Sequence, residues 1–165
     1  MQFDPRDLVL DLASLRNGSN SGSFEIDMPG IAWGIEDAQP ASPSGTLDLD
    51  VNYSEKSVIV RGRLSACFAT SCARCLGRAV FEVTEDVFAA FSRDGGNTAD
   101  GSMARLPRDG RSLRLLDAVK EAVILSVPGK PLCREDCRGL CPVCGENLNE
   151  GRCGHEGAAG AGCVR

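Results

Sequence analysis

The placement of cysteine constrains this chain more than any other feature of its sequence. Five of the nine cysteines and the single histidine lie between Leu132 and His155. At the centre stands Cys141-Pro142-Val143-Cys144-Gly145, whose two thiols can bind one tetrahedral metal ion from a tight turn. A second close pair, Cys153 and His155, follows after a short polar loop. We therefore predict one zinc ion held by Cys141, Cys144, Cys153 and His155.

Disulfides or unreactive thiols are the alternative interpretation of these cysteines. Disulfides belong to oxidising compartments. The first residues carry Asp4, Asp7 and Asp11 and lack the continuous apolar run of a signal peptide. No later run approaches the roughly 20 apolar residues of a membrane span. We therefore expect a cytoplasmic protein without membrane contact, in which clustered cysteines are more often metal ligands or redox groups.

Two more close pairs of cysteines lie far from each other in the sequence. They are Cys72 with Cys75 and Cys133 with Cys137. We predict that they converge on a second zinc ion, so the expected content is one zinc, or two if this site forms. A thioredoxin-like redox pair would need its C-x2-C to open a helix. Residues 76–83, LGRAVFEV, have the pattern of a strand instead. Packed or free thiols remain a third interpretation.

Alternating apolar residues predict an antiparallel sheet. Strands are expected over residues 7–12, 24–28, 46–52, 57–65 and 79–91. The turn between the last two carries the first C-x2-C, and Cys67 before it is expected in the core. Residues 17–23, NGSNSGS, predict a turn-rich linker.

One strong helical pattern covers residues 113–127. Its apolar stripe comprises Leu116, Val119, Val123 and Val127, widened by Leu115, Ala122 and Ile124. We expect this helix to pack on the sheet. The polar residues 92–112 predict a mobile loop. In the loop at 29–45, Trp33 is expected to be a packing residue rather than an anchor for a partner.

These elements predict an α+β fold, an antiparallel β-sheet body covered by one main helix, with a small C-terminal zinc-knuckle extension. The body with its embedded C-x2-C turn is expected over residues 1–128, and the cysteine-rich zinc-binding segment over 129–155. The small residues of 156–165 predict a disordered tail that holds Cys163 as a spare thiol.

Charge and motifs narrow the classes of function. Residues 1–102 hold 8 Lys/Arg against 15 Asp/Glu, whereas residues 103–165 hold 10 against 8. An acidic body argues against wrapping nucleic acid over a broad surface, and it fits either a basic protein partner or simple solubility. No G-x-S-x-G elbow or P-loop is present. Sites with four protein ligands are closed and structural. We therefore expect no enzyme and no small-molecule substrate.

The cysteine regions and the segment between them resemble the YceD family, named for large-subunit ribosomal RNA accumulation. The matching residues are Cys72–Leu76, Leu115–Glu121, Pro128–Cys133, Asp136–Gly145 and Asn147–Asn149. Some members of that family keep the central C-x2-C and lack the C-terminal knuckle, which fits two separable sites. Relatives more usually carry Cys where this chain has His155, and imidazole is also a good zinc ligand.

The resemblance implies a non-enzymatic role in 23S rRNA accumulation during large-subunit biogenesis. It implies a ribosomal protein or a pre-ribosomal particle as partner, and leaves direct contact with rRNA open. A function from another class, a thiol-based redox or metal-sensing protein using Cys72 and Cys75, also stays open. Bound metal with inaccessible thiols would favour the role in rRNA accumulation. Reversible oxidation of Cys72 and Cys75 without metal would favour the redox or metal-sensing role.

Overall fold

The computed structural model describes residues 1–36, 38–93, 103–107, 110–151 and 153–155. Its elements, in chain order, are β1 (Gln2–Asp4), β2 (Val9–Asp11), η1 (Leu12–Ser14), β3 (Gly18–Asp27), β4 (Gln39–Pro40), β5 (Ser44–Tyr53), β6 (Ser57–Ser71), β7 (Arg78–Ser92), β8 (Ala104–Arg105), β9 (Ser112–Arg114) and α1 (Leu116–Ser126). Strands therefore dominate the described chain, which supports an α+β assignment.

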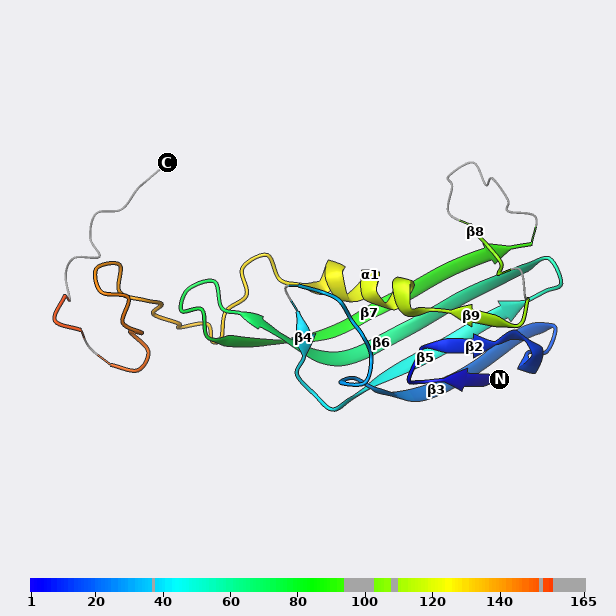
Figure 1. Ribbon diagram of the computed structural model, residues 1–165, viewed down its shortest axis with the longest axis horizontal. Coiled ribbons are helices and arrows are strands. Elements are labelled where there is room, and N and C mark those ends of the chain that lie inside the picture. Colours follow the sequence, from blue (N-terminus) through cyan, green and yellow to red (C-terminus); the bar gives the residue numbers. More distant parts are fainter. Residues whose placement is uncertain (37, 94–102, 108–109, 152, 156–165) are drawn as a thin grey trace.

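The large sheet has the strand order β3-β5-β6-β7-β8, with β4 paired to β6 (Figure 1). Its pairs are antiparallel except for the short parallel pair of β7 with β8. The hairpin of β6 and β7 pairs from Ser57 with Ser92 to Ser71 with Arg78. It therefore reaches far beyond β5 and presents the Cys72–Cys75 turn at its tip.

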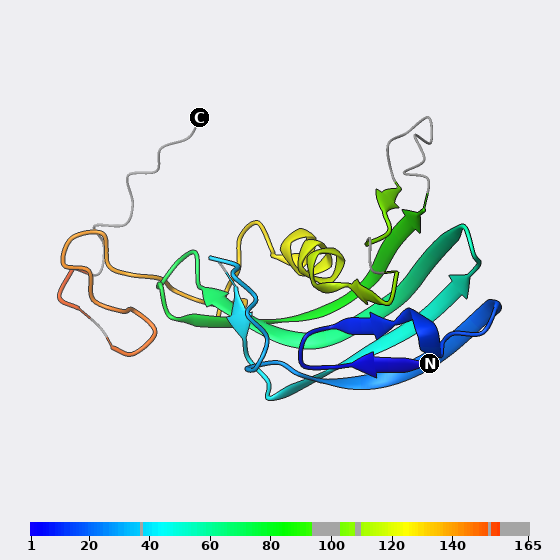
Figure 2. The same ribbon diagram turned by 45° about the vertical axis from the view of Figure 1, so that its right-hand side comes forward.

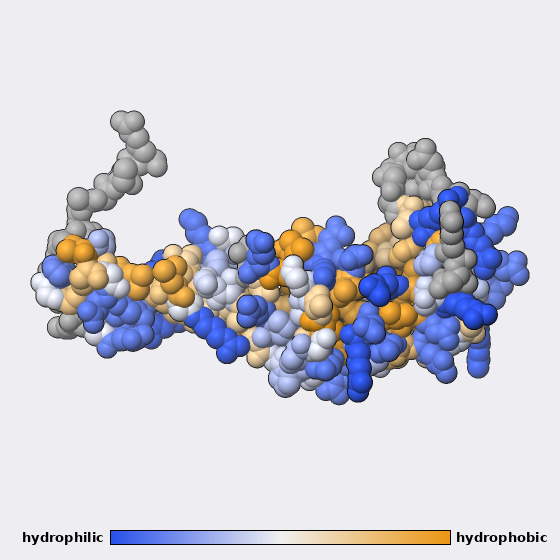
Figure 3. Space-filling view, viewed as in Figure 1, coloured by the Kyte–Doolittle hydropathy of each residue, from blue (hydrophilic) through white to orange (hydrophobic). Residues whose placement is uncertain are grey.

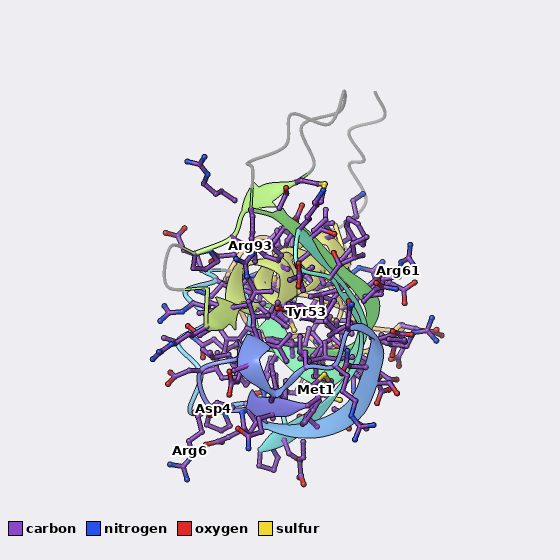
Figure 4. The ribbon with its side chains drawn as sticks, turned by 90° about the vertical axis from the view of Figure 1, so that its right-hand side faces the viewer. Met1, Asp4, Arg6, Tyr53, Arg61 and Arg93 are labelled. Atoms are coloured by element: carbon purple, nitrogen blue, oxygen red, sulfur yellow. The ribbon has the colours of Figure 1, made fainter. Side chains whose placement is uncertain are left out.

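Burial alternates along the strands as the apolar pattern predicts. In β5, Leu47, Leu49 and Val51 are buried and the residues between them are exposed. The outer face carries the charged side chains, and Figure 4, viewed from the end opposite the cysteines, shows Arg61 outside the curve of the sheet. The sheet thus has one packed face and one solvated face, as antiparallel sheets commonly do.

A small sheet of order β1-β2-β9 and the helix α1 complete the core on the packed face (Figure 2). Val119, Ala122 and Val123 of α1 are buried in the same cluster as Leu10 of β2 and Leu113 of β9. A single apolar core therefore joins both sheets and the helix.

Two expected packing roles have different outcomes. Trp33 is buried, donates its indole N–H to the Met28 carbonyl at 2.8 Å and packs edge-on against Phe68. Its expected packing role is confirmed. Cys67 is half-buried and pairs with Glu82 across the hairpin. It points to the solvated face, because buried Ala66 and Phe68 on either side take the core face, so its placement in the core was wrong.

Two element boundaries and the burial of one helix residue differ from the sequence-based expectation. The expected linker at 17–23 belongs to β3, which pairs with β5 from Gly18 and Tyr53 onward because backbone pairing needs no apolar side chain. The expected helix start at 113–115 is wrong: Leu113 pairs with Leu10 in the small sheet, and α1 begins at Leu116. Ile124 also lies 55% exposed rather than in the buried stripe.

The chain beyond α1 leaves the body. Residues 130–151 and 153–155 run alongside the tip of the β6–β7 hairpin and then past it, forming with residues 72–77 a narrow projection that we call the arm (Figure 1). The predicted mobile loop at 92–112 is described only in part, with β8 and the start of β9 inside it. The predicted disordered tail at 156–165 lies outside the described residues.

Candidate metal centres

The turn between β6 and β7 positions the first two cysteines of the arm. The backbone N–H of Cys72 donates to the Gly77 carbonyl at 2.7 Å, and that of Leu76 to the Cys72 carbonyl at 3.0 Å. Leu76 closes the turn in the left-handed region, at φ 60°. These bonds turn both thiols toward the same side, where Cys72 and Cys75 are buried.

The chain after α1 brings the second pair to this turn through backbone hydrogen bonds. Ala73 donates to the Pro131 carbonyl at 2.7 Å, and Leu140 donates to the Arg74 carbonyl at 3.1 Å. Gly139 has φ 77°, and a Cβ there would lie 3.0 Å from the Arg74 carbonyl oxygen. This glycine is therefore needed both for its backbone conformation and for the close approach.

The four sulfurs of Cys72, Cys75, Cys133 and Cys137, here called the arm cluster, converge on one point. Their Sγ atoms lie within 4.8 Å of one another, with Cys72 to Cys137 at 3.7 Å and Cys75 to Cys133 at 3.6 Å. A tetrahedral ion with bonds of about 2.3 Å would separate its sulfur ligands by about 3.8 Å. The geometry therefore suits a four-coordinate metal. Cys72, Cys75 and Cys137 are buried in a cluster apart from the main core, and Cys133 is exposed.

Hydrogen bonds ionise part of the arm cluster before any metal binds. The backbone N–H of Cys75, with that of Arg74, donates to the Cys72 sulfur and lowers the pKa of Cys72 from 9.0 to about 6. The neighbouring Cys137 sulfur raises the pKa of Cys133 to about 12. The Cys72 thiolate is thus available at neutral pH, whereas the crowded Cys133 keeps its proton.

Asn149 supports the arm cluster from outside, a role that sequence reasoning missed. Its Nδ2 donates to the Cys137 sulfur at 3.4 Å, and its Oδ1 accepts from the backbone N–H of Arg138 and from the Arg134 guanidinium, both at 2.8 Å. Asn147 in turn accepts from Asn149 Nδ2 at 2.8 Å. The only sequence signal was the Asn-Leu-Asn that follows the second C-x2-C.

The second group comprises Cys141, Cys144, Cys153 and His155, and we call it the knuckle cluster. One ligand atom from each lies within 4.8 Å of the others. Cys141 is buried, whereas Cys144 and His155 are exposed. Backbone N–H groups of Cys144 and Val143 lower the pKa of Cys141 from 9.0 to about 6. The structure therefore brings together all eight residues singled out from the sequence, in the two groups expected.

The two C-x2-C turns share one backbone design. Cys141 donates to the Glu146 carbonyl and accepts from Gly145, both at 2.8 Å, which repeats the bonds of Cys72 with Gly77 and Leu76. Gly145 has φ 75°, close to that of Leu76 in the first turn. The repetition indicates one kind of ligand loop used twice.

A family model described as "Large ribosomal RNA subunit accumulation protein YceD" matches residues 60–160, which include both clusters. The chain belongs to the YceD family. It is 35% identical over 106 residues to an uncharacterized protein of Mycobacterium tuberculosis and 30% identical over 106 residues to one of Mycobacterium leprae. These matches cover 62% of this chain and 50% and 48% of the relatives, so the chain spans about half the length of the curated relatives it matches. No solved structure matches it.

The position of Cys72 and Cys75 in the fold differs from that of a thioredoxin-like redox pair. Cys75 is followed by the strand β7, so the Cys72–Cys75 pair does not open a helix as a thioredoxin-like pair does. Both thiols contact the second cysteine pair rather than forming an isolated dithiol.

Within the described residues, no helix has the length and apolarity needed to cross a membrane.

Proposed function

We propose that this YceD protein is a non-enzymatic, zinc-stabilised factor in large ribosomal subunit biogenesis, needed for accumulation of 23S rRNA. The observation that carries the proposal is the pair of four-ligand clusters inside the segment that defines the family match. We propose the arm cluster and the knuckle cluster as two zinc sites.

The donor atoms support zinc over other ions. Calcium and magnesium take oxygen ligands, whereas thiolate and imidazole in tetrahedral sets are typical of zinc. Each cluster offers four protein ligands, which fills the coordination of the ion and leaves no position for a substrate. The metal would therefore act in folding rather than in catalysis.

Zinc in the arm cluster would fix the direction of the arm. Its ligands come from the hairpin of the body and from the segment after α1, so the ion would join the proposed body, residues 1–128, to the proposed segment 129–155. The knuckle cluster would order the end of the arm. A rigid projection of this kind suits a cytoplasmic assembly factor that presents one surface to a ribosomal protein, a pre-ribosomal particle or rRNA.

The test is the level of 23S rRNA in cells that lack the gene. We expect reduced 23S rRNA and large subunits relative to 16S rRNA, restored by the wild-type gene. A Cys133→Ser/Cys137→Ser variant should restore them poorly, and a Cys67→Ser variant, altered at a cysteine outside both clusters, should restore them fully. Normal 23S rRNA in the deletion strain would contradict the proposed function.

A thiol-based redox or metal-sensing function is the second candidate, because the lowered pKa of Cys72 makes a thiolate available near neutral pH. It predicts reversible oxidation of Cys72 and Cys75 in protein isolated without metal. Tightly bound zinc with thiols that resist alkylation would exclude it.

A further inference from the structure

Leu76 occupies a backbone conformation that a leucine rarely adopts. Its φ is 60°, in the region where a Cβ crowds the backbone. The equivalent residue of the knuckle turn is Gly145, which adopts the same conformation without that strain. Leu76 gains no burial in return, because its side chain is 70% exposed. A strained and exposed leucine indicates a role outside the fold.

Exposed cations and apolar side chains alternate from this turn into β7. Arg74, Leu76, Arg78 and Val80 are all exposed, with Val80 at 55%. We call these four residues the turn surface. Leu76 and Val80 belong to neither buried cluster nor to the apolar residues packed against them. Figure 3 shows apolar side chains exposed along the arm, interspersed with hydrophilic ones.

The turn surface is held in place by the arm cluster beneath it. The backbone N–H of Arg74 donates to the Cys72 sulfur at 3.4 Å, and the Arg74 guanidinium donates to the Cys137 carbonyl at 2.8 Å. Ala73 and Arg74 also bond to the chain after α1. A surface fixed in this way loses little conformational entropy when it binds a partner.

Positive charge gathers at the base of the arm, where it meets the body. Residues 72–80 and 129–141 together hold five Lys/Arg against two Asp/Glu, whereas residues 142–155 hold one against two and residues 1–71 hold five against ten. A polyanion is therefore attracted to the base of the arm and repelled by residues 1–71. Arginine suits phosphate through its fork of N–H donors.

We propose that the turn surface binds single-stranded RNA, a proposal that rests on the proposed function and names its partner. Arg74 and Arg78 bind backbone phosphates, and the exposed Leu76 and Val80 contact the faces of unstacked bases. RNA fits better than an acidic peptide because the two apolar residues are separate points between cations rather than a continuous groove.

The test is fluorescence anisotropy with the zinc-loaded full chain and a fluorescein-labelled single-stranded RNA of mixed sequence. Leu76→Gly should weaken binding while leaving the unfolding temperature unchanged or higher, since glycine relieves the strain. Arg78→Ala should weaken binding and lower the slope of log K against log salt by about 0.7. Together the two changes should weaken binding about tenfold. Arg61→Ala and Leu125→Ala, exposed residues of β6 and α1, are the matched controls and should bind like wild type.

Four outcomes would overturn this proposal. The first three are no binding by wild type at low salt, unchanged affinity in Leu76→Gly and Arg78→Ala, and equal loss in the control variants. The fourth is displacement of the RNA by an acidic peptide at lower concentration, which would assign the surface to a protein instead. Because this assay needs no cells, its failure leaves the 23S rRNA result intact, and normal 23S rRNA in the deletion strain leaves the binding result intact.

Discussion

Loss of one arm ligand should destabilise the whole body, although the ligand lies outside it. Cys133→Ser is the informative change because Cys133 is exposed, so its sulfur contributes little core packing. Cys75 and Cys133 are 58 residues apart, and the segment between them contains β7 and α1. The chain-entropy relation for a cross-link closing a loop of that length gives about 4 kcal/mol of stabilisation. For a chain of this size that corresponds to roughly 10 °C in unfolding temperature.

Trp33 provides the assay, because it is the single tryptophan and is buried in the body against Phe68. Urea unfolding in the presence of zinc, followed by Trp33 fluorescence, should show that Cys133→Ser lowers the free energy of unfolding by about 4 kcal/mol. Cys144→Ser is the matched control: Cys144 is also exposed, and the knuckle ligands between Cys141 and His155 enclose no element of the body. Equal Trp33 transitions in wild type and Cys133→Ser would refute the reasoning.

Three further predictions concern the core, the support of the arm cluster and its protons. Val123→Asp should cost several kcal/mol and unfold the body in circular dichroism, because Val123 is fully buried in α1; a stable variant would contradict its packing. Asn149→Ala should weaken zinc retention about tenfold in chelator competition, since a donor to Cys137 is lost. Calorimetry in buffers of different ionisation enthalpy should find fewer than four protons released per zinc at the arm cluster at pH 7. Cys72 has a pKa of about 6, so it is already ionised at pH 7 and releases no proton when zinc binds. Zinc retention should therefore fall as the pH drops through about 6 and Cys72 becomes protonated. Release of four protons would contradict its lowered pKa.

The body of the sheet was predictable because its strands each bury one face. The alternation of Leu47, Leu49 and Val51 predicted β5, and the burial follows it. The strand expected at 24–28 is the second half of β3, but the first half was missed because Gly18 to Ser23 contains no large apolar residue. The membership of that half in the sheet depends on backbone pairing with β5, which leaves no trace in side-chain hydrophobicity. The start of α1 was misplaced because Leu113 fits a helical stripe and a strand equally well.

The grouping of the two candidate metal clusters was predictable from the close spacing of their ligand pairs, because residues a few positions apart can lie in a single tight turn. The hydrogen bond from Asn149 to the Cys137 sulfur was not predictable, because it depends on how the chain folds back after the second turn. Nor was the strain at Leu76, because a sequence does not reveal the sign of φ. Leu76 and Gly145 each follow the second cysteine of a C-x2-C, and the repeated hydrogen bonding of the two turns shows that they occupy equivalent positions.

The central claim is that two zinc ions hold the arm, and native mass spectrometry of the purified full chain tests it most directly. We predict two zinc ions in wild type, and one in Cys72→Ser/Cys75→Ser, which keeps the knuckle cluster. His155→Ala should loosen the knuckle zinc and leave the arm zinc in place. One zinc in wild type that persists in Cys72→Ser/Cys75→Ser would mean that the arm cluster holds no metal, and the claim would be wrong.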